Sequence, residues 1–243
     1  MDRYKKLCVL GAGSFGKVYK VLNKDDGLEY VLKRIALSNS EDAKLKAFEE
    51  VDVLEDISHV FIVGIIEHFW DDEEQDLCVV MTYCQKGDLY TFIQKQWESN
   101  QLVPEATVWR FMVQMLSALA YLHSDMKIMH RDLKTQNIFM LERDDGKLCA
   151  MIGDFGLAKK LEETFAMAKT PLGTPFYMAP EIMSGNSYNY KSDMWALGCI
   201  GYELCTRDPA FGASTFPGVA NKVLRGEYDP MPACYSQDLQ KVI

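Results

Sequence analysis

The stretch His130-Arg131-Asp132-Leu133-Lys134-Thr135-Gln136-Asn137 brings several chemically distinct polar side chains into one short segment, and Asp154-Phe155-Gly156 follows it. A carboxylate such as Asp132 can accept the proton of an attacking hydroxyl, and Lys134 can meet a phosphate as a point charge. Asn137 and Asp154 offer oxygen ligands, which Mg²⁺ prefers to nitrogen or sulfur. Together these groups predict a site that moves a phosphoryl group.

The bulk composition restricts the class of protein. With 243 residues, 48% of them hydrophobic, the chain can bury a sizeable core as one large domain or two lobes. The net charge of -9 comes without a basic cluster, which argues against nucleic acid or a membrane as the main partner. The apolar runs fall short of the ~20 residues that cross a bilayer, and the charged residues 1–6 do not resemble a signal peptide.

The cysteines indicate a reducing compartment. They are scattered, odd in number and without a C-x-x-C pair, a pattern that favours free core thiols over disulfides or a zinc site. We therefore expect an intracellular, cytoplasmic protein. The seven positions are Cys8, Cys78, Cys84, Cys149, Cys199, Cys205 and Cys234.

The first third of the chain shows the period-two alternation of strands around one helical segment. Strands are expected at 6–10, 17–22, 29–35, 60–70 and 77–83. A helix is expected at 43–57, with Leu45, Phe48, Val51 and Leu54 on its apolar face. The charged run 71–76 is predicted to be a solvated hairpin turn.

The rest of the chain is predicted to be mostly helical. Pro104 and Glu105 suit the first turn of a helix. An apolar stripe behind them is predicted to be core: Val108, Phe111, Met112, Met115, Leu116, Leu119 and Leu122. The predicted fold is α+β, with a β-rich N-lobe at 1–81, a hinge at 82–87 and a mostly helical C-lobe at 88–243.

The glycine-rich segment Gly11-Ala12-Gly13-Ser14-Phe15-Gly16-Lys17-Val18 fits three phosphate-binding patterns. A Walker loop would need a Ser or Thr hydroxyl where Val18 stands, and a dinucleotide-binding loop would need a helix after the glycines. The alternation after Gly16 instead favours a strand–glycine–strand hairpin, in which backbone N–H groups approach phosphates. By itself the segment is equally well explained as a plain β-turn.

Lys33 strengthens the hairpin interpretation. It lies in Tyr30-Val31-Leu32-Lys33, a strand whose alternation directs a polar residue towards the interior of the lobe. A partly buried Lys needs an acidic partner, because an unpaired charge there costs several kcal/mol. Glu50, on the helix that follows, is the expected partner.

With these residues in place, the chain resembles a eukaryotic protein kinase over essentially its whole length. The segments that carry the resemblance include the 130–137 stretch, Asp154-Phe155-Gly156, Ala179-Pro180-Glu181 and Asp193-x-Trp195-x-x-Gly198. Further segments resemble the NIMA-related (NEK) serine/threonine kinases in particular: Tyr30 to Lys33, Val80 to Cys84, His130 to Phe139, Gly153 just before Asp154, Ala168 to Met178 and Lys191 to Cys199.

The resemblance implies an enzyme that transfers the γ-phosphate of ATP, with Mg²⁺, to Ser or Thr hydroxyls of protein substrates. Asp132 would be the base, Lys134 would contact the γ-phosphate, and Asn137 and Asp154 would hold Mg²⁺. Lys33 and Glu50 would hold the α- and β-phosphates. The implied nucleotide-binding residues are Leu10, Gly11, Ala12, Gly13, Ser14, Phe15, Gly16, Lys17, Val18, Lys33, the gatekeeper Met81, and the backbones of Thr82 and Cys84.

The resemblance also implies regulation. Thr170 aligns with the family's activation-loop site, and phosphate adds roughly -1.5 to -2 charge, which an arginine can pair. We expect phospho-Thr170 to pair with Arg131, Thr174 to make a structural hydrogen bond near Asp132, and phosphorylation to occur between copies of the chain. Roles in mitosis, centrosomes or cilia follow by analogy with the family.

Two departures from the family pattern bear on these expectations. Val60-Phe61 stands where the family usually has Pro-Asn. In addition, kinase domains normally continue past Ile243 with helices that supply an Arg to Glu181, so the chain is expected to be a fragment or a destabilised kinase. A buried, unpaired Glu181 would cost about 3–5 kcal/mol.

The alternative class is a pseudokinase or nucleotide-binding scaffold. A pseudokinase usually lacks the lysine, the catalytic aspartate or the metal-binding aspartate. This chain has all three, at Lys33, Asp132 and Asp154. A small-molecule kinase is disfavoured by Ala179-Pro180-Glu181 and the long segment before it, which serve protein substrates.

Overall fold

The computed structural model describes residues 3–13, 16–37, 40–154 and 175–243. These residues form two compact units, which we call the N-terminal unit (3–85) and the C-terminal unit (86–154 and 175–243). The break between Gln85 and Lys86 falls inside the stretch 82–87. The role of that stretch as a hinge stays a prediction.

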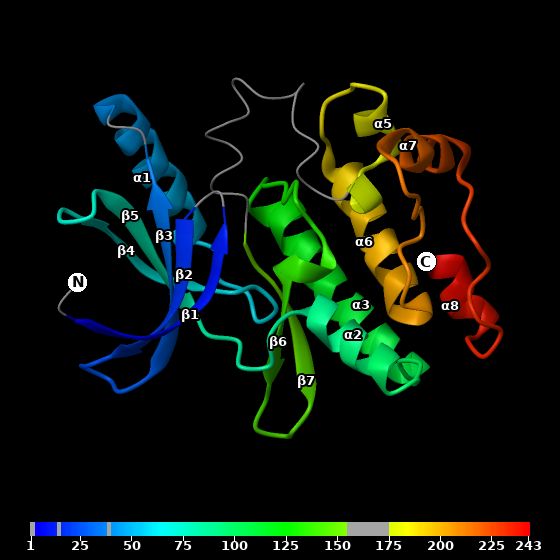
Figure 1. The fold of residues 1–243 in the computed structure, drawn as a ribbon, viewed down its shortest axis with the longest axis horizontal. Coiled ribbons are helices and arrows are strands. Elements are labelled where there is room, and N and C mark those ends of the chain that lie inside the picture. Colours follow the sequence, from blue (N-terminus) through cyan, green and yellow to red (C-terminus); the bar gives the residue numbers. More distant parts are fainter. Residues whose placement is uncertain (1–2, 14–15, 38–39, 155–174) are drawn as a thin grey trace. The chain divides into compact units, whose positions relative to one another are not determined.

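The N-terminal unit is built on an antiparallel sheet of five strands in the order β1-β2-β3-β5-β4 (Figure 1). The strands are β1 (Tyr4–Gly13), β2 (Gly16–Asn23), β3 (Glu29–Ala36), β4 (Ile65–Asp71) and β5 (Asp76–Thr82). The predicted strands are thereby confirmed, with one correction at 60–70. Val60 and Phe61 form a turn closed by the Ile62 N–H bonding to His59 O at 3.1 Å, so β4 begins only at Ile65.

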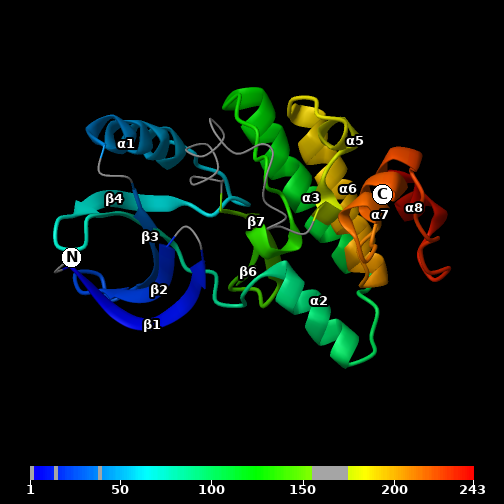
Figure 2. The ribbon, with the colours of Figure 1, turned by 45° about the horizontal axis from the view of Figure 1, so that its top comes forward.

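The two faces of this sheet are covered differently. One face carries a core of Tyr4, Val21, Leu32, Cys78 and Val80, with Phe69 stacked on Tyr4. The other face packs against the helix α1 (Glu41–Glu55), which runs beside β4 (Figure 2).

The apolar face of α1 differs from the predicted one by one residue. Val51 and Leu54 are buried as expected, and the ring of Phe48 meets His68 edge-on at 5.3 Å. Leu45, however, is 61% exposed, and Ala47 is the buried residue of that turn. The four-residue spacing from Ala47 to Val51 follows the helical period more closely than the six-residue spacing from Leu45.

The charged run 71–76 corrects a second expectation. It does form the turn between β4 and β5, but Asp71 is only 6% exposed in its side chain and lies 3.3 Å from the guanidinium of Arg34. Asp76 lies 3.1 Å from the same group. Arg34 on β3 is itself buried, so it needs these carboxylates beside it. The predicted solvated turn is therefore wrong for Asp71.

The C-terminal unit is mostly helical, as expected, with one two-stranded ribbon. The ribbon pairs β6 (Ile138–Glu142) with β7 (Leu148–Ile152). The helices are α2 (Leu89–Glu98), α3 (Glu105–Ala120), α5 (Pro180–Met183), α6 (Tyr190–Thr206), α7 (Phe216–Arg225) and α8 (Gln237–Val242), shown in Figure 1. Short helical turns lie at Tyr121–Asp125, Thr135–Asn137 and Pro175–Tyr177.

Two helices form the core of the C-terminal unit. The predicted stripe on α3 is buried at Val108, Phe111, Met112, Met115 and Leu119, while Leu116 is half-buried. Helix α6 is buried along most of its length, which explains its apolar composition on all sides. Its first turn is fixed by a capping box, in which Asn189 and Ser192 satisfy each other's backbone N–H groups. This firm start holds Asp193 in place one residue later.

None of the helices in the described part of the chain combines the length and the apolar composition that a membrane span requires.

Candidate active site

The glycine-rich segment forms the predicted hairpin. β1 and β2 pair antiparallel with Gly11 opposite Val18 and Gly13 opposite Gly16, so no helix follows the glycines. This rules out the dinucleotide-binding arrangement. Gly16 has φ +129°, and a Cβ there would lie 1.8 Å from Arg34 O, so only glycine fits. Ser14 and Phe15, at the tip, lie outside the described residues.

The strand register gathers predicted nucleotide-binding residues on one face of the sheet. Val18 is opposite Lys33, Lys33 is opposite Val79, and Met81 is opposite Val31 two positions along. Opposed side chains in an antiparallel pair share a face. Val79 is also opposite His68, which touches α1, so Lys33 lies on the face that α1 covers. Glu50 belongs to α1 and is half-buried; its ion pair with Lys33 stays a prediction.

The end of β5 constrains how the predicted adenine contacts could be made. The Thr82 N–H donates to Gly64 O at 3.0 Å, so a contact from Thr82 to adenine could use only its carbonyl. Cys84, two residues on, is buried. At the other side of the predicted site, Leu10 is 47% exposed and Lys17 is exposed at the start of β2.

In the C-terminal unit, the stretch 130–137 is anchored by one buried carboxylate. Asp193, 1% exposed, accepts the backbone N–H of His130 at 2.9 Å and that of Arg131 at 3.0 Å. His123 Nε2 lies 2.8 Å from the same carboxylate. Three directed hydrogen bonds thus compensate the burial of this charge.

This anchoring supports an unusual backbone conformation. Arg131 has φ +67° and Asp154 has φ +54°, both in the left-handed region that non-glycine residues rarely adopt. Such conformations persist where surrounding contacts hold them, and they cluster at functional sites. For Arg131, the hydrogen bond of its own N–H to Asp193 is that contact.

His130 joins this loop to the segment that leads to Asp154. Its Nδ1 accepts the Asp132 N–H at 3.3 Å, and its Nε2 lies 3.1 Å from Gly153 O. The ring is therefore satisfied as the neutral tautomer that carries its proton on Nε2, and complete burial lowers its pKa accordingly. The sequence analysis gave His130 and His123 no role, because the contacts of His130 with Gly153 and of His123 with Asp193 join residues that are far apart in the chain.

Asp132, Lys134 and Asn137 lie together in the structure. Lys134 Nζ lies 2.7 Å from Asp132 Oδ2, and Asn137 Nδ2 donates to the same oxygen at 3.1 Å. Asn137 Nδ2 also donates to the Asp132 carbonyl at 2.7 Å, while the Asn137 carbonyl accepts the Gly153 N–H at 3.0 Å. The carboxylate is thus held in one orientation from two sides.

The donor chemistry of this cluster suits Mg²⁺. Asn137 uses its amide nitrogen for both side-chain hydrogen bonds, and its Oδ1 makes none with a described residue. With the carboxylate of Asp154 this leaves oxygen donors alone, which is the ligand set of a hard cation.

A second network behind the loop was missed by the sequence analysis. Thr135 Oγ1 lies 2.9 Å from the hydroxyl of Tyr177, and that hydroxyl donates to Glu203 Oε2 at 2.5 Å. Glu203 is buried on α6, and burial raises its pKa to about 7. Burial and the neighbouring carboxylate also raise the pKa of Tyr177, so the phenol keeps its proton as the donor. The network connects the stretch 130–137 to the turn at Pro175–Tyr177.

Glu181 corrects the prediction of a buried, unpaired carboxylate. It is half-buried, and Ser192 Oγ donates to its Oε1 at 2.6 Å. Because Glu181 has this partner and some access to water, the predicted penalty does not apply. The other predicted residues of this region, Thr170 and Thr174, lie outside the described residues, as do Phe155 and Gly156.

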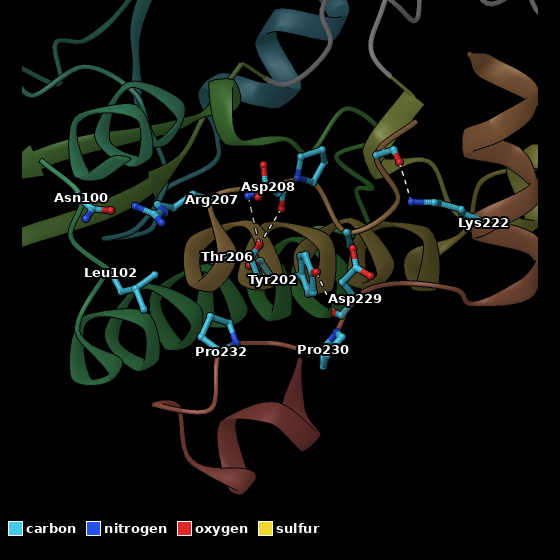
Figure 3. Close-up of a pocket in the computed structure, with 13 residues that line it drawn as sticks. Asn100, Leu102, Tyr202, Thr206, Arg207, Asp208, Lys222, Asp229, Pro230 and Pro232 are labelled. Atoms are coloured by element: carbon cyan, nitrogen blue, oxygen red, sulfur yellow. Dashed lines mark hydrogen bonds between the residues drawn. The ribbon is translucent and has the colours of Figure 1, made fainter. Parts of the chain in front are cut away.

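A separate cavity of 660 Å³ lies near the end of α6 and contains none of the predicted site residues. Figure 3 shows Tyr202 and Thr206 at its centre. The Tyr202 hydroxyl donates to Asp229 O, and the Thr206 hydroxyl bonds to Asp208 O, both at 2.9 Å. These bonds join the end of α6 to the segments that follow it.

Comparison with known proteins agrees with this geometry. The protein kinase domain model matches residues 4–240. The chain is 41% identical to the serine/threonine-protein kinase Nek4 of Mus musculus over 241 residues, covering 99% of this chain and 29% of that protein. It is 40% identical to the probable serine/threonine-protein kinase nek2 of Dictyostelium discoideum over 246 residues, covering 100% of this chain and 58% of that protein.

The human relative gives the same result. The chain is 39% identical to the serine/threonine-protein kinase Nek2 of Homo sapiens over 247 residues, covering 100% of this chain and 55% of that protein. The chain thus spans less than two thirds of the length of these curated relatives. It belongs to the protein kinase domain family, and the curated relatives described above are NEK serine/threonine kinases.

Proposed function

We propose that this chain is the catalytic domain of a NEK-type serine/threonine protein kinase that transfers the γ-phosphate of ATP to Ser or Thr hydroxyls of proteins. The observation that carries the proposal is the position of the Asp132 carboxylate. It is held between Lys134 Nζ at 2.7 Å and Asn137 Nδ2 at 3.1 Å, with a side chain still 23% exposed to a substrate.

Each residue of this cluster has a separate chemical role. Asp132 orients the substrate hydroxyl and takes its proton as the hydroxyl oxygen bonds to the γ-phosphorus and ADP leaves. Lys134 offsets negative charge on the transferred group. Asn137 Oδ1 and the Asp154 carboxylate would hold Mg²⁺, which supplies positive charge beside the phosphate oxygens when ATP is bound.

The N-terminal unit would bind the nucleotide. In the proposal the phosphates lie against the glycine-rich hairpin between β1 and β2, and Val18 shares a face with Lys33 and Met81. In the proposal, Glu50 on α1 positions Lys33 against the phosphates. The Thr82 carbonyl and the Cys84 backbone would form hydrogen bonds with the edge of the adenine. Thr82 would use its carbonyl because its N–H already donates to Gly64 O.

Regulation by phosphorylation is part of the proposal. Phospho-Thr170, formed by another copy of the chain, would pair with the Arg131 guanidinium, and Thr174 would bond near Asp132. The fixed left-handed backbone of Arg131 supports this, because it sets the direction in which the side chain leaves the loop. Replacing Thr170 by Ala should abolish activation in protein that is otherwise phosphorylated there, and unchanged activity would contradict this part.

The partners proposed are protein substrates, with neither nucleic acid nor a membrane as the main partner. A cytoplasmic location is proposed, because thiols stay reduced in that compartment. All seven cysteines are free, and five of them are buried, which supports a reducing compartment.

The decisive experiment measures Mg²⁺-dependent transfer of labelled γ-phosphate to casein and to the chain itself. Asp132→Asn should lower the rate about 10²–10⁴-fold, because it removes the base. Asp144→Asn is the matched control, since that carboxylate is exposed in the turn between β6 and β7 and should leave the rate unchanged. Absence of transfer in the unmodified chain, while ATP still raises its Tm, would contradict catalysis and favour a nucleotide-binding module.

A further inference from the structure

Three potential metal ligands meet on the N-terminal unit, where α1 runs beside β4 (Figure 2). Asp52 and Glu55 are three positions apart on α1, so they share one side of the helix. His68 projects from β4 towards them. Its Nδ1 lies 2.9 Å from Glu55 Oε2, and its Nε2 lies 3.4 Å from Asp52 Oδ1. All three ligand atoms lie within 4.8 Å of one another.

The hydrogen-bonding capacity of the imidazole does not match this environment. A neutral imidazole carries one N–H and one acceptor nitrogen, and a carboxylate only accepts. Here a carboxylate oxygen lies at each ring nitrogen. In the neutral ring, the nitrogen without a proton therefore faces a carboxylate oxygen, and both of these atoms are acceptors. A bound cation, or a second ring proton, removes that conflict.

The distances distinguish the two sides of the ring. At 2.9 Å, Glu55 Oε2 accepts a normal hydrogen bond from Nδ1–H, which leaves Nε2 as the unprotonated nitrogen. At 3.4 Å, Asp52 Oδ1 makes no hydrogen bond to Nε2. That separation equals the about 3.3–3.5 Å between two ligands on a tetrahedral Zn²⁺ with bonds of about 2.0–2.1 Å.

The ring is also fixed in place before any ion binds. Its side chain is 11% exposed, and it packs edge-on against Phe48 of α1 at 5.3 Å between centroids. A carboxylate that accepts from the second nitrogen of a metal-bound histidine is the usual device for fixing its tautomer and orientation. Glu55 occupies that position here.

We propose that Asp52, Glu55 and His68 form a binding site for a divalent transition-metal ion of the Zn²⁺ type. His68 Nε2 and Asp52 are the direct ligands, Glu55 holds the ring through Nδ1–H, and water completes the coordination. The imidazole selects Zn²⁺ over Mg²⁺, because Mg²⁺ prefers oxygen ligands alone.

An ion at this site would join α1 to β4. Glu50, the proposed partner of Lys33, lies on α1 two positions before Asp52, so the ion would restrict movement of the helix that carries it. The site itself does not depend on the proposed kinase function, since none of its ligands takes part in phosphoryl transfer. Its test therefore needs no nucleotide.

The experiment titrates ZnCl₂ into the 243-residue chain by calorimetry at pH 7.5, and measures Tm in parallel. The chain carries Cys8→Ser and Cys234→Ser, because those two exposed thiols could bind zinc themselves. We expect one Zn²⁺ per chain, and a Tm rise of about 3–5 °C at tenfold excess over Kd. The binding should persist in millimolar Mg²⁺.

Single substitutions locate the ion. His68→Gln, Asp52→Asn and Glu55→Gln should each weaken binding at least about tenfold, while Glu49→Gln, an exposed carboxylate on the same helix, should not. The side chains of Asp52 and Glu55 are 66% and 37% exposed, so their variants remain folded even if His68→Gln does not. Equal affinity in the Asp52 and Glu55 variants would overturn the proposal. The absence of 1:1 binding of Zn²⁺ by the chain would overturn it as well.

Discussion

Arg34 in the N-terminal unit and Asp193 in the C-terminal unit are both buried charges, but their surroundings differ. Arg34, 5% exposed, is surrounded by the carboxylates of Asp71, Asp76 and Glu74 at 3.1–3.5 Å. These distances allow charge attraction, yet its Nε and Nη2 make no directed hydrogen bond with a described residue. Asp193 accepts three hydrogen bonds of 2.8–3.0 Å, two of them from backbone N–H groups.

The difference suggests that the Arg34 group stabilises the fold, whereas Asp193 positions the backbone beside the proposed base. Charge attraction depends weakly on angle, so the Arg34 group holds β3, β4 and β5 together without fixing any backbone conformation. Hydrogen bonds to backbone N–H groups are directional, so Asp193 fixes the conformation of His130 and Arg131, next to the proposed base. Four substitutions test this contrast, from the largest expected effect to the smallest.

Asp193→Ala should have the largest effect. It leaves two buried N–H groups without an acceptor and removes the support for the left-handed Arg131. We expect the unfolding free energy to fall by at least about 3 kcal/mol and phosphoryl transfer by at least about 100-fold. Denaturant titration and the casein assay measure the two effects. Asp193→Asn keeps one acceptor oxygen, so its stability and activity should lie between those of Asp193→Ala and the parent. Full activity in Asp193→Ala would refute the positioning role.

Arg34→Ala should lower stability by about 3–5 kcal/mol, because it leaves the buried carboxylate of Asp71 unpaired. In protein that remains folded, kcat should change less than tenfold. Lys46→Ala is the matched control, since its ion pair with Asp42 is exposed to solvent and contributes little to stability. If both variants lose the same free energy in denaturant titration, the burial argument fails.

Glu203→Gln extends the contrast to a buried acid whose bond is to a phenol. Its folded-state pKa of about 7 lies above the ordinary value of 4.5. The stability that it contributes is therefore complete below pH 4.5 and is lost as the pH rises to 7.

Glutamine imitates the protonated acid at every pH. Relative to the parent, Glu203→Gln should therefore gain roughly 2–3 kcal/mol between pH 5 and pH 8. Unfolding free energies measured across this range provide the check. A constant difference between the two proteins would show that Glu203 is ionised throughout.

Ser192→Ala should have the smallest effect. It removes one bond of the α6 capping box and the hydrogen bond to Glu181, but the Asn189 cap of α6 remains. A loss of about 1 kcal/mol is expected in thermal or chemical unfolding. Ser184→Ala is the comparison, since its hydroxyl bonds only to an exposed helix carbonyl. A much larger loss for Ser192 would mean that Glu181 needs this partner more than its half-buried position implies.

Sequence patterns predicted the features that depend on near neighbours. The glycines and the alternation after Gly16 are local, and they led to the hairpin that the structure shows. The spacing of Asp132, Lys134 and Asn137 is local as well, and Lys134 and Asn137 both contact Asp132, while the roles of the three residues stay predictions. The local pattern failed in two places. The strand predicted at 60–70 begins only at Ile65, because Val60 and Phe61 form a turn. Leu45 is exposed because Ala47 is the buried residue of that helical turn.

The features that sequence patterns did not predict depend on distant residues. His123 lies 70 positions from Asp193, and Tyr177 lies 26 positions from Glu203, so neither contact leaves a periodic trace. The burial of Asp71 depends on Arg34 reaching it from another strand. A run of charged residues by itself predicts exposure to solvent, because most such runs have no buried residue of opposite charge beside them.

The bond from Asp193 to the His130 N–H also sets an order of events during synthesis. The carboxylate that holds the catalytic stretch lies 63 positions after it. At about 5–20 residues per second, a ribosome needs roughly 3–13 s to add that length of chain. During most of that interval the nascent chain already contains Asp132, Lys134 and Asn137 but lacks the carboxylate that holds the backbone of their loop, so the proposed active site cannot take its final form until Asp193 of α6 has been added.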